Sequence, residues 1–123
     1  MKKLLLTALI FTAPVLADVE CKTRKEMAKD IMLERQVTPN IATMMQDHKK
    51  KGATKTTEFM IIAAYNYPYI NAKGQLEKAG RMNDSPEKER ALKKYERMIA
   101  SRITLANRFA DRAFKSCMRS KGK

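Results

Sequence analysis

The chain contains two cysteines, Cys21 and Cys117, which lie close to its opposite ends. Two cysteines allow one intramolecular pairing, so a bond between them ties the ends together without ambiguity. In the chain-entropy description, closing a loop of nearly a hundred residues stabilises a fold by roughly 4 to 5 kcal/mol. We therefore expect an intramolecular disulfide, and the alternatives are two buried free thiols or a bridge between molecules.

The first residues have the three-part pattern of a secretory signal peptide. Lys2 and Lys3 precede an apolar run over residues 4–16, and small side chains lead up to Ala17. This run is shorter than the ~20 residues that span a bilayer. We expect cleavage after Ala17, which leaves residues 18–123 as one periplasmic domain that does not span the membrane once processed. Export also brings the cysteines to a compartment where disulfides form.

The apolar residues after position 18 recur with the spacing of an α-helix, which predicts an all-α bundle of about four helices closed by the disulfide. Glycine and proline are rare, at four each in the whole chain, so few positions interrupt a helix. The pattern predicts helices over residues 19–36, 38–52, 54–65 and 86–121, with an irregular or weakly helical segment over 69–84. The second helix is expected to be capped by Thr38, and the third to be central and buried, because it is apolar on every side.

The last predicted helix would be about 50 Å long, against about 34 Å for the diameter of a compact domain of this size. It must therefore bend or project. A Cys21–Cys117 bond places the first and last helices antiparallel, so Ile31 and Met32 are expected to meet the apolar residues of segment 106–110. An overhang would then lie at the amino end, near residues 86–95.

Positive charge dominates the composition, with 26 Lys and Arg residues against 13 Asp and Glu residues. Without Lys2 and Lys3 the formal charge of +13 becomes +11. Such a balance favours an acidic protein or anionic envelope polymers as partner, although a charged face serving only solubility is the alternative. Export and the absence of interleaved aromatic residues argue against nucleic acid. The basic residues that we single out lie on the last helix: Arg102, Arg108, Arg112, Lys115 and Arg119.

No catalytic constellation is recognisable, so we expect a protein that is not an enzyme and carries no cofactor or metal. The chain has no glycine-rich phosphate loop, no nucleophile elbow and no Cys-x-x-Cys pair. Its single histidine, His48, is expected at the edge of the core rather than in catalysis or metal binding. The methionines are scattered, which favours packing over Cu(I) ligation.

The segment YNYPY, residues 65–69, holds three of the four tyrosines. Tyr65 continues the third helix and is expected in the core. Asn66, Tyr67 and Tyr69 flank Pro68 in a turn, where tyrosines either form a structural corner or stay half-exposed as anchors for a partner. Both interpretations remain open for this cluster.

The order C…IM..RQ…MM…AY..P…C resembles a loose group of small signal-bearing proteins of tailed phages and proteobacterial prophages. It is carried by residues 21–70 and Cys117, and Arg35 and Gln36 fall on motif positions without a known role. A weaker similarity links the chain to exported phage proteins that block the lysozyme of a superinfecting phage. Either resemblance implies a non-enzymatic helical protein of the periplasm.

The sequence therefore predicts a small exported binding protein of the inhibitor type, which covers a protein partner in the periplasm or cell envelope. Tyr67 and Tyr69 would act as anchors and the basic last helix would attract an acidic partner. Two other functions are consistent with the sequence: a periplasmic stress holdase that loses structure at low pH, and a cationic binder of envelope polyanions whose affinity collapses with salt.

Overall fold

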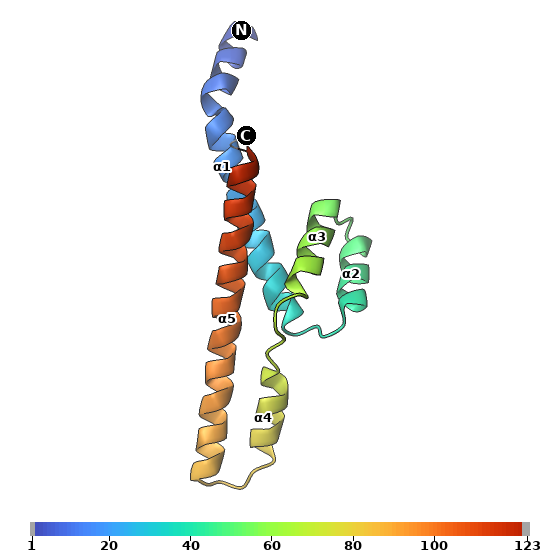
Figure 1. Ribbon diagram of the computed structural model, residues 1–123, viewed down its shortest axis with the longest axis vertical. Coiled ribbons are helices and arrows are strands. Elements are labelled where there is room, and N and C mark those ends of the chain that lie inside the picture. Colours follow the sequence, from blue (N-terminus) through green and yellow to red (C-terminus); the bar gives the residue numbers. More distant parts are fainter. Residues whose placement is uncertain (1, 122–123) are drawn as a thin grey trace.

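The structure is a computed structural model that describes the backbone of residues 2–121 and the side chains of residues 19–121. The predicted signal peptide, residues 1–17, lies outside the residues whose side chains are described. Five helices and no strand occur in the described part of the chain, which confirms the all-α class (Figure 1). The helices are α1 (Lys2–Arg35), α2 (Ile41–Lys50), α3 (Lys55–Ala64), α4 (Ala72–Gly80) and α5 (Pro86–Lys121).

The two long helices α1 and α5 lie side by side and antiparallel, as predicted (Figure 1). Ile31 and Met32 of α1 belong to one buried cluster with Phe109 of α5. Alanines lie between them on both helices, and because their side chains are small the two backbones can approach closely. The alanines of this contact are Ala28, Ala106 and Ala110, each no more than 1% exposed.

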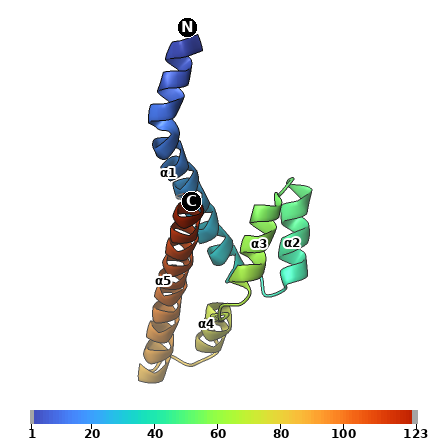
Figure 2. The same cartoon turned by 45° about the horizontal axis from the view of Figure 1, so that its top comes forward.

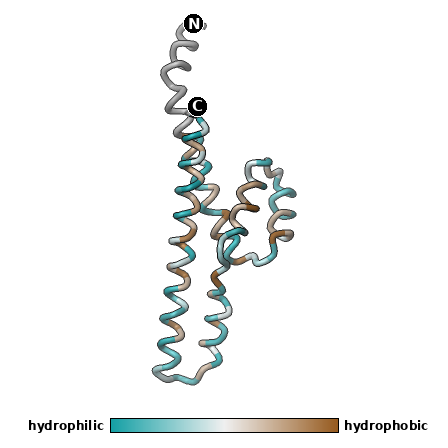
Figure 3. The backbone as a smooth tube through the Cα atoms, in the orientation of Figure 1, coloured by the Kyte–Doolittle hydropathy of each residue, from teal (hydrophilic) through white to brown (hydrophobic). Residues whose placement is uncertain are grey.

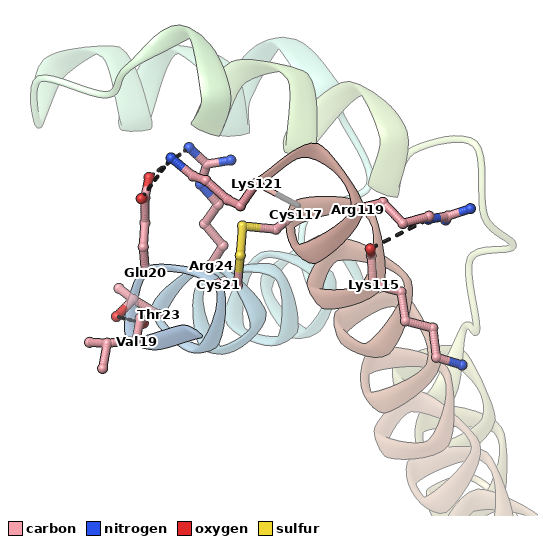
Figure 4. The surroundings of a disulfide bond; sticks show 9 residues. All are labelled: Val19, Glu20, Cys21, Thr23, Arg24, Lys115, Cys117, Arg119 and Lys121. Atoms are coloured by element: carbon pink, nitrogen blue, oxygen red, sulfur yellow. Dashed lines mark hydrogen bonds and ion pairs between the residues drawn. A yellow bond between two sulfur atoms is a disulfide. The ribbon is translucent and has the colours of Figure 1, made fainter. Parts of the chain in front are cut away.

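The predicted disulfide closes this helix pair (Figure 4). The Cα atoms of Cys21 and Cys117 are 5.5 Å apart. Beside it, the Lys121 ammonium lies 2.8 Å from the Glu20 carboxylate. This hydrogen bond, with a further contribution from Arg24, lowers the pKa of Glu20 below its ordinary value. A covalent bond and an ion pair thus join α1 and α5 at the same end of the molecule.

Helices α2 and α3 form a short hairpin on one flank of the long pair, with α3 nearer to α5 than α2 in both views (Figures 1 and 2). The predicted cap at Thr38 is wrong: α2 begins at Ile41, and the Asn40 side chain accepts a hydrogen bond from the Ala42 amide at 2.8 Å. An Asx side chain is a strong N-cap, so it defines the start of the helix here. Gly52 lies in the turn after α2 and has a φ of +80°, a conformation that favours glycine.

Helix α3 is not the buried central helix that its composition predicted. Only Thr57, Ile61 and Ala64 are buried, on the face that meets α1 and α2. Phe59 is 68% exposed and Ile62 is 47% exposed. The helix therefore keeps an uncovered apolar face, because no further helix of the described chain covers it.

The amino half of α5 projects past α1, as expected, and α4 packs along it to make a two-helix arm (Figure 1). Ser85 caps α5 by accepting a hydrogen bond from the Lys88 amide at 3.2 Å, and Pro86 takes the first helical position. The segment of α4 was expected to be irregular or weakly helical, and the structure shows a helix whose first turn the Asn71 side chain caps at the Gly74 amide. The arm is mostly hydrophilic (Figure 3).

Candidate functional site

The loop after α3 is held by a buried glutamine at the end of α1. The Gln36 amide donates to the Pro68 carbonyl at 3.0 Å, and its oxygen accepts from the Ile70 amide at 2.7 Å. Gln36 is fully buried, so these two bonds satisfy polar groups that would otherwise be costly to bury. Arg102 of α5 donates from Nε and Nη2 to the Ile70 carbonyl, at 3.1 and 2.9 Å. The loop is therefore anchored to both long helices.

Arg35 lies beside Gln36 and is also buried, at 7% exposure. Its guanidinium is 4.3 Å from the ring centroid of Tyr65 and 5.2 Å from that of Tyr69. Arg35 Nε and Nη1 have no hydrogen-bond partner among the described residues. The cation is instead stabilised by cation–π contacts with the two tyrosine rings. Arg35 and Gln36, which the sequence left without a role, hold the tyrosine loop in position.

Of the residues predicted to bind a partner, the structure brings Tyr67 and Arg112 into contact, and it packs Tyr69 against Arg35. Tyr67 makes an edge-to-face contact with Phe109, with ring centroids 5.3 Å apart. Its hydroxyl accepts a hydrogen bond from Arg112 Nη1 at 2.6 Å. Tyr69 lies against Arg35, whereas Asn66, which precedes Tyr67, is exposed. The cluster is thus a structural corner whose one side, formed by Tyr67 and Arg112, faces outward.

That side forms part of an apolar groove of about 460 Å³ between α3 and the carboxyl half of α5. Phe59, Met60 and Ala63 form the α3 wall, and Phe109, Ala113 and Cys117 lie on the α5 wall. Tyr67 closes one end, and Arg24 lies with Cys117 near the disulfide. The volume of the groove is in the range of ligand-binding clefts, about 300 to 1,000 Å³.

A stripe of cations runs along α5 next to this groove. Arg108, Arg112, Lys115 and Arg119 follow one another at spacings of four, three and four residues, which places them on one helix face. None of the four forms an ion pair within the region 19–121. We call these four residues the basic stripe. Figure 4 shows Lys115 and Arg119 pointing away from the Glu20 ion pairs.

Two other charged side chains in this half of α5 do have partners of opposite charge on α1. Asp111, the acidic residue within this part of α5, pairs with Lys25 of α1 at 3.1 Å. Lys121 pairs with Glu20. Within residues 19–121 no acidic side chain neutralises the basic stripe, which lies along the edge of an apolar surface.

His48 Nε2 lies 2.5 Å from a Glu34 oxygen, which links α2 to α1 at the edge of the core, where the histidine was expected. Within the described residues no group of three or more His, Cys, Asp or Glu side chains is placed to hold a metal ion. No helix in that part of the chain is long and apolar enough to cross a bilayer.

The sequence did not reveal the groove, although one signal for it was present. The run FMIIAAY, residues 59–65, is apolar on every side, which indicates either a central helix or a helix with an uncovered apolar face. The structure shows the second case. No protein-family model, curated protein or solved structure shows a significant match to this chain.

Proposed function

We propose that the chain is an exported, non-catalytic binding protein that acts in the periplasm or cell envelope by covering part of a protein partner. One observation carries the proposal: an apolar groove lies directly beside four cations that have no acidic partner among the side chains of residues 19–121. Aromatic and arginine side chains around an apolar centre are the typical composition of protein interfaces. Tyr67 and Arg112 contribute to this face, and Asn66 and Tyr69 lie on the adjoining loop.

The sequence supports the location and the origin of the partner in this proposal. The signal-type segment over residues 1–17 and the Cys21–Cys117 bond both suit an oxidising compartment outside the cytoplasm. The resemblance to exported phage and prophage proteins favours a partner of the host envelope or of a competing phage. Occlusion needs only a fixed surface, and the disulfide and the anchored loop provide one.

The test compares partner capture by two surface variants. Phe59→Ser removes the most exposed ring of the groove edge, and Ile103→Ser removes a half-exposed side chain of α5 outside the groove. Tagged protein recovered from the periplasm is crosslinked in envelope extract and its partners are identified by mass spectrometry. We expect Phe59→Ser to lose a partner that the wild type and Ile103→Ser retain. Equal recovery of every partner by both variants would refute the groove as the binding face.

A second candidate function, binding of an envelope polyanion, is favoured by the basic stripe alone. It predicts that capture falls steeply with ionic strength and does not depend on Phe59, because exposed charges are screened within about 10 Å at 0.1 M salt. Measuring capture by wild type and Phe59→Ser across a salt series separates the two functions. Loss of capture on removing the apolar ring at constant salt supports a protein partner.

A further inference from the structure

The groove has the shape of a trough between two helices. On α3 its wall residues Thr56, Met60 and Ala63 recur at helical spacing, so they form one face over about 10 Å. On α5 the wall runs from Phe109 to Ser120, which corresponds to about 16 Å of helix. In Figures 1 and 2 α3 lies level with the carboxyl half of α5, with part of α1 between them. The trough is therefore about two to three helical turns long.

The backbone of both walls is already hydrogen-bonded. The wall residues lie within α3 and α5, whose amide and carbonyl groups pair inside each helix. An extended peptide bound there would find no main-chain partners for its own amides, and buried unpaired amides are costly. A helix brings its backbone already satisfied, so it is the form of chain that suits this trough.

The two edges of the trough differ in chemistry. The α5 edge carries the basic stripe, to which Arg112 belongs while also lining the groove. The α3 edge carries Phe59 and Ile62, both well exposed. A segment that fits both edges needs an apolar face for the floor and for Phe59, and carboxylates on the flank that faces α5. A second copy of this chain fits poorly, because its long helix α5 would bring further cations to the stripe.

Resting on the proposed function, we infer that the groove binds two to three turns of an amphipathic helix from an acidic partner protein. Apolar side chains of the occupant, spaced three or four residues apart, enter the trough between α3 and α5. Its Glu and Asp side chains lie along the basic stripe. The partner is therefore recognised through a short acidic helix, and not through a β-strand, a single carboxylate in a loop or a polyanion.

The probe is a labelled synthetic peptide of about 18 residues, long enough for the isolated helix to be populated. It carries leucines along one helix face and glutamates along both flanks. Two control peptides are used: an isomer of the same composition with the leucines scattered around the helix, and a peptide with lysine in place of glutamate. Binding to the full protein is followed by fluorescence anisotropy at fixed ionic strength. We expect the acidic amphipathic peptide alone to bind.

Two triple variants with the same change in net charge locate the site. Arg108→Glu, Lys115→Glu and Arg119→Glu reverse the basic stripe and leave the Arg112–Tyr67 bond in place. Lys93→Glu, Lys94→Glu and Arg97→Glu reverse three exposed cations on the arm.

The stripe triple should weaken peptide binding about ten-fold, since the loss of three exposed ion pairs of ordinary strength sums to that factor. The arm triple should change binding by less than about two-fold. If circular dichroism shows that the stripe triple has lost helix, the single variants Lys115→Glu and Lys93→Glu replace the two sets.

Four other results contradict the inference. Equal weakening in the two triples would show attraction by net charge alone, and equal binding of the scattered-leucine isomer would show a site for polyanions. Binding that survives Ala113→Phe, which fills the trough, would place the peptide elsewhere. A Phe59-dependent partner from the envelope together with no peptide binding would leave the proposed function standing and remove the acidic helix. Groove-specific peptide binding with no envelope partner would support the acidic helix as the occupant and contradict the proposed function.

Discussion

The side chain of Gln36 joins the end of α1 to a loop 32 residues further along the chain. Beside it, Arg35 packs between Tyr65 and Tyr69, so two consecutive residues determine the shape of the tyrosine loop. The sequence indicated that this loop is either a corner or a contact surface. It could not separate the two, because the deciding interactions come from residues distant in sequence. The corner is formed by Arg35 and Gln36, and the outward side by Tyr67 with Arg112.

Tyr65 offers a test of this arrangement through pH. Its hydroxyl donates to the Thr38 carbonyl at 2.5 Å, and burial raises its pKa above the ordinary value of 10.0. A raised pKa means that the folded state holds the proton more tightly than the unfolded chain, so stability is full below pH 10 and falls as pH rises through the folded-state pKa. We expect urea unfolding between about pH 9 and 12 to show this loss.

The matched variant is Tyr65→Phe, which cannot ionise. It should be less stable at about pH 8 by about 1 kcal/mol, because the Thr38 carbonyl loses its hydrogen bond. Its stability should then fall less steeply than that of the wild type as the pH rises above about 10. Parallel declines in the two proteins would contradict the assignment.

At the scale of elements, the helices with strong local signals were predicted well and those that depend on packing were not. Ser85 and Pro86 give α5 a local start signal, and its antiparallel contact with α1 follows from the disulfide. Helix α4 was predicted only as an irregular or weakly helical segment because Gly74 and Gly80 weaken its pattern, and its stability depends on burying Ala72 and Ala79 against α5. Similarly, composition could not show that α3 lies on a flank, since an apolar face looks the same whether or not another helix covers it.

The two glycines of α4 are expected to respond differently to replacement by alanine. A methyl group added at Gly80 would meet no atom within 4 Å, so Gly80→Ala should stabilise the protein by about 0.5–1 kcal/mol through helix propensity. At Gly74 a Cβ atom would lie 2.5 Å from Asn71 Nδ2. Gly74→Ala must therefore displace the Asn71 cap, and losing a cap costs about 1 kcal/mol, which offsets the propensity gain. Urea denaturation midpoints compare the two, and equal stabilisation by both would show that the cap does not hold α4.

At the scale of the whole molecule, the fold has one closed end and one projecting end. The disulfide and the Glu20–Lys121 pair join α1 to α5 near the groove, whereas the α4–α5 arm lies far from them (Figure 1). The fold class and the tie between the ends could be predicted because cysteine count and helical periodicity are properties of the sequence itself. The groove could not be predicted from the sequence. It depends on the spacing between α3 and α5, and the sequence of either helix by itself does not determine that spacing.

Replacing both cysteines by serine tests how much this closed end contributes. The two residues are 96 positions apart, so the chain-entropy description predicts a loss of roughly 4 kcal/mol. We expect the double variant Cys21→Ser/Cys117→Ser to unfold at much lower urea concentration than the oxidised wild type. The wild type treated with reductant is the control for the serine side chains. If all three proteins unfold at the same concentration, the long α1–α5 contact alone closes the fold.

The position of Cys117 also has a consequence for biosynthesis. Its partner, Cys21, is made early, and the two thiols can meet only after almost the whole polypeptide has been synthesised. A polypeptide that ends before residue 117 contains Cys21 as its single cysteine. It therefore cannot form the intramolecular bond under any redox condition.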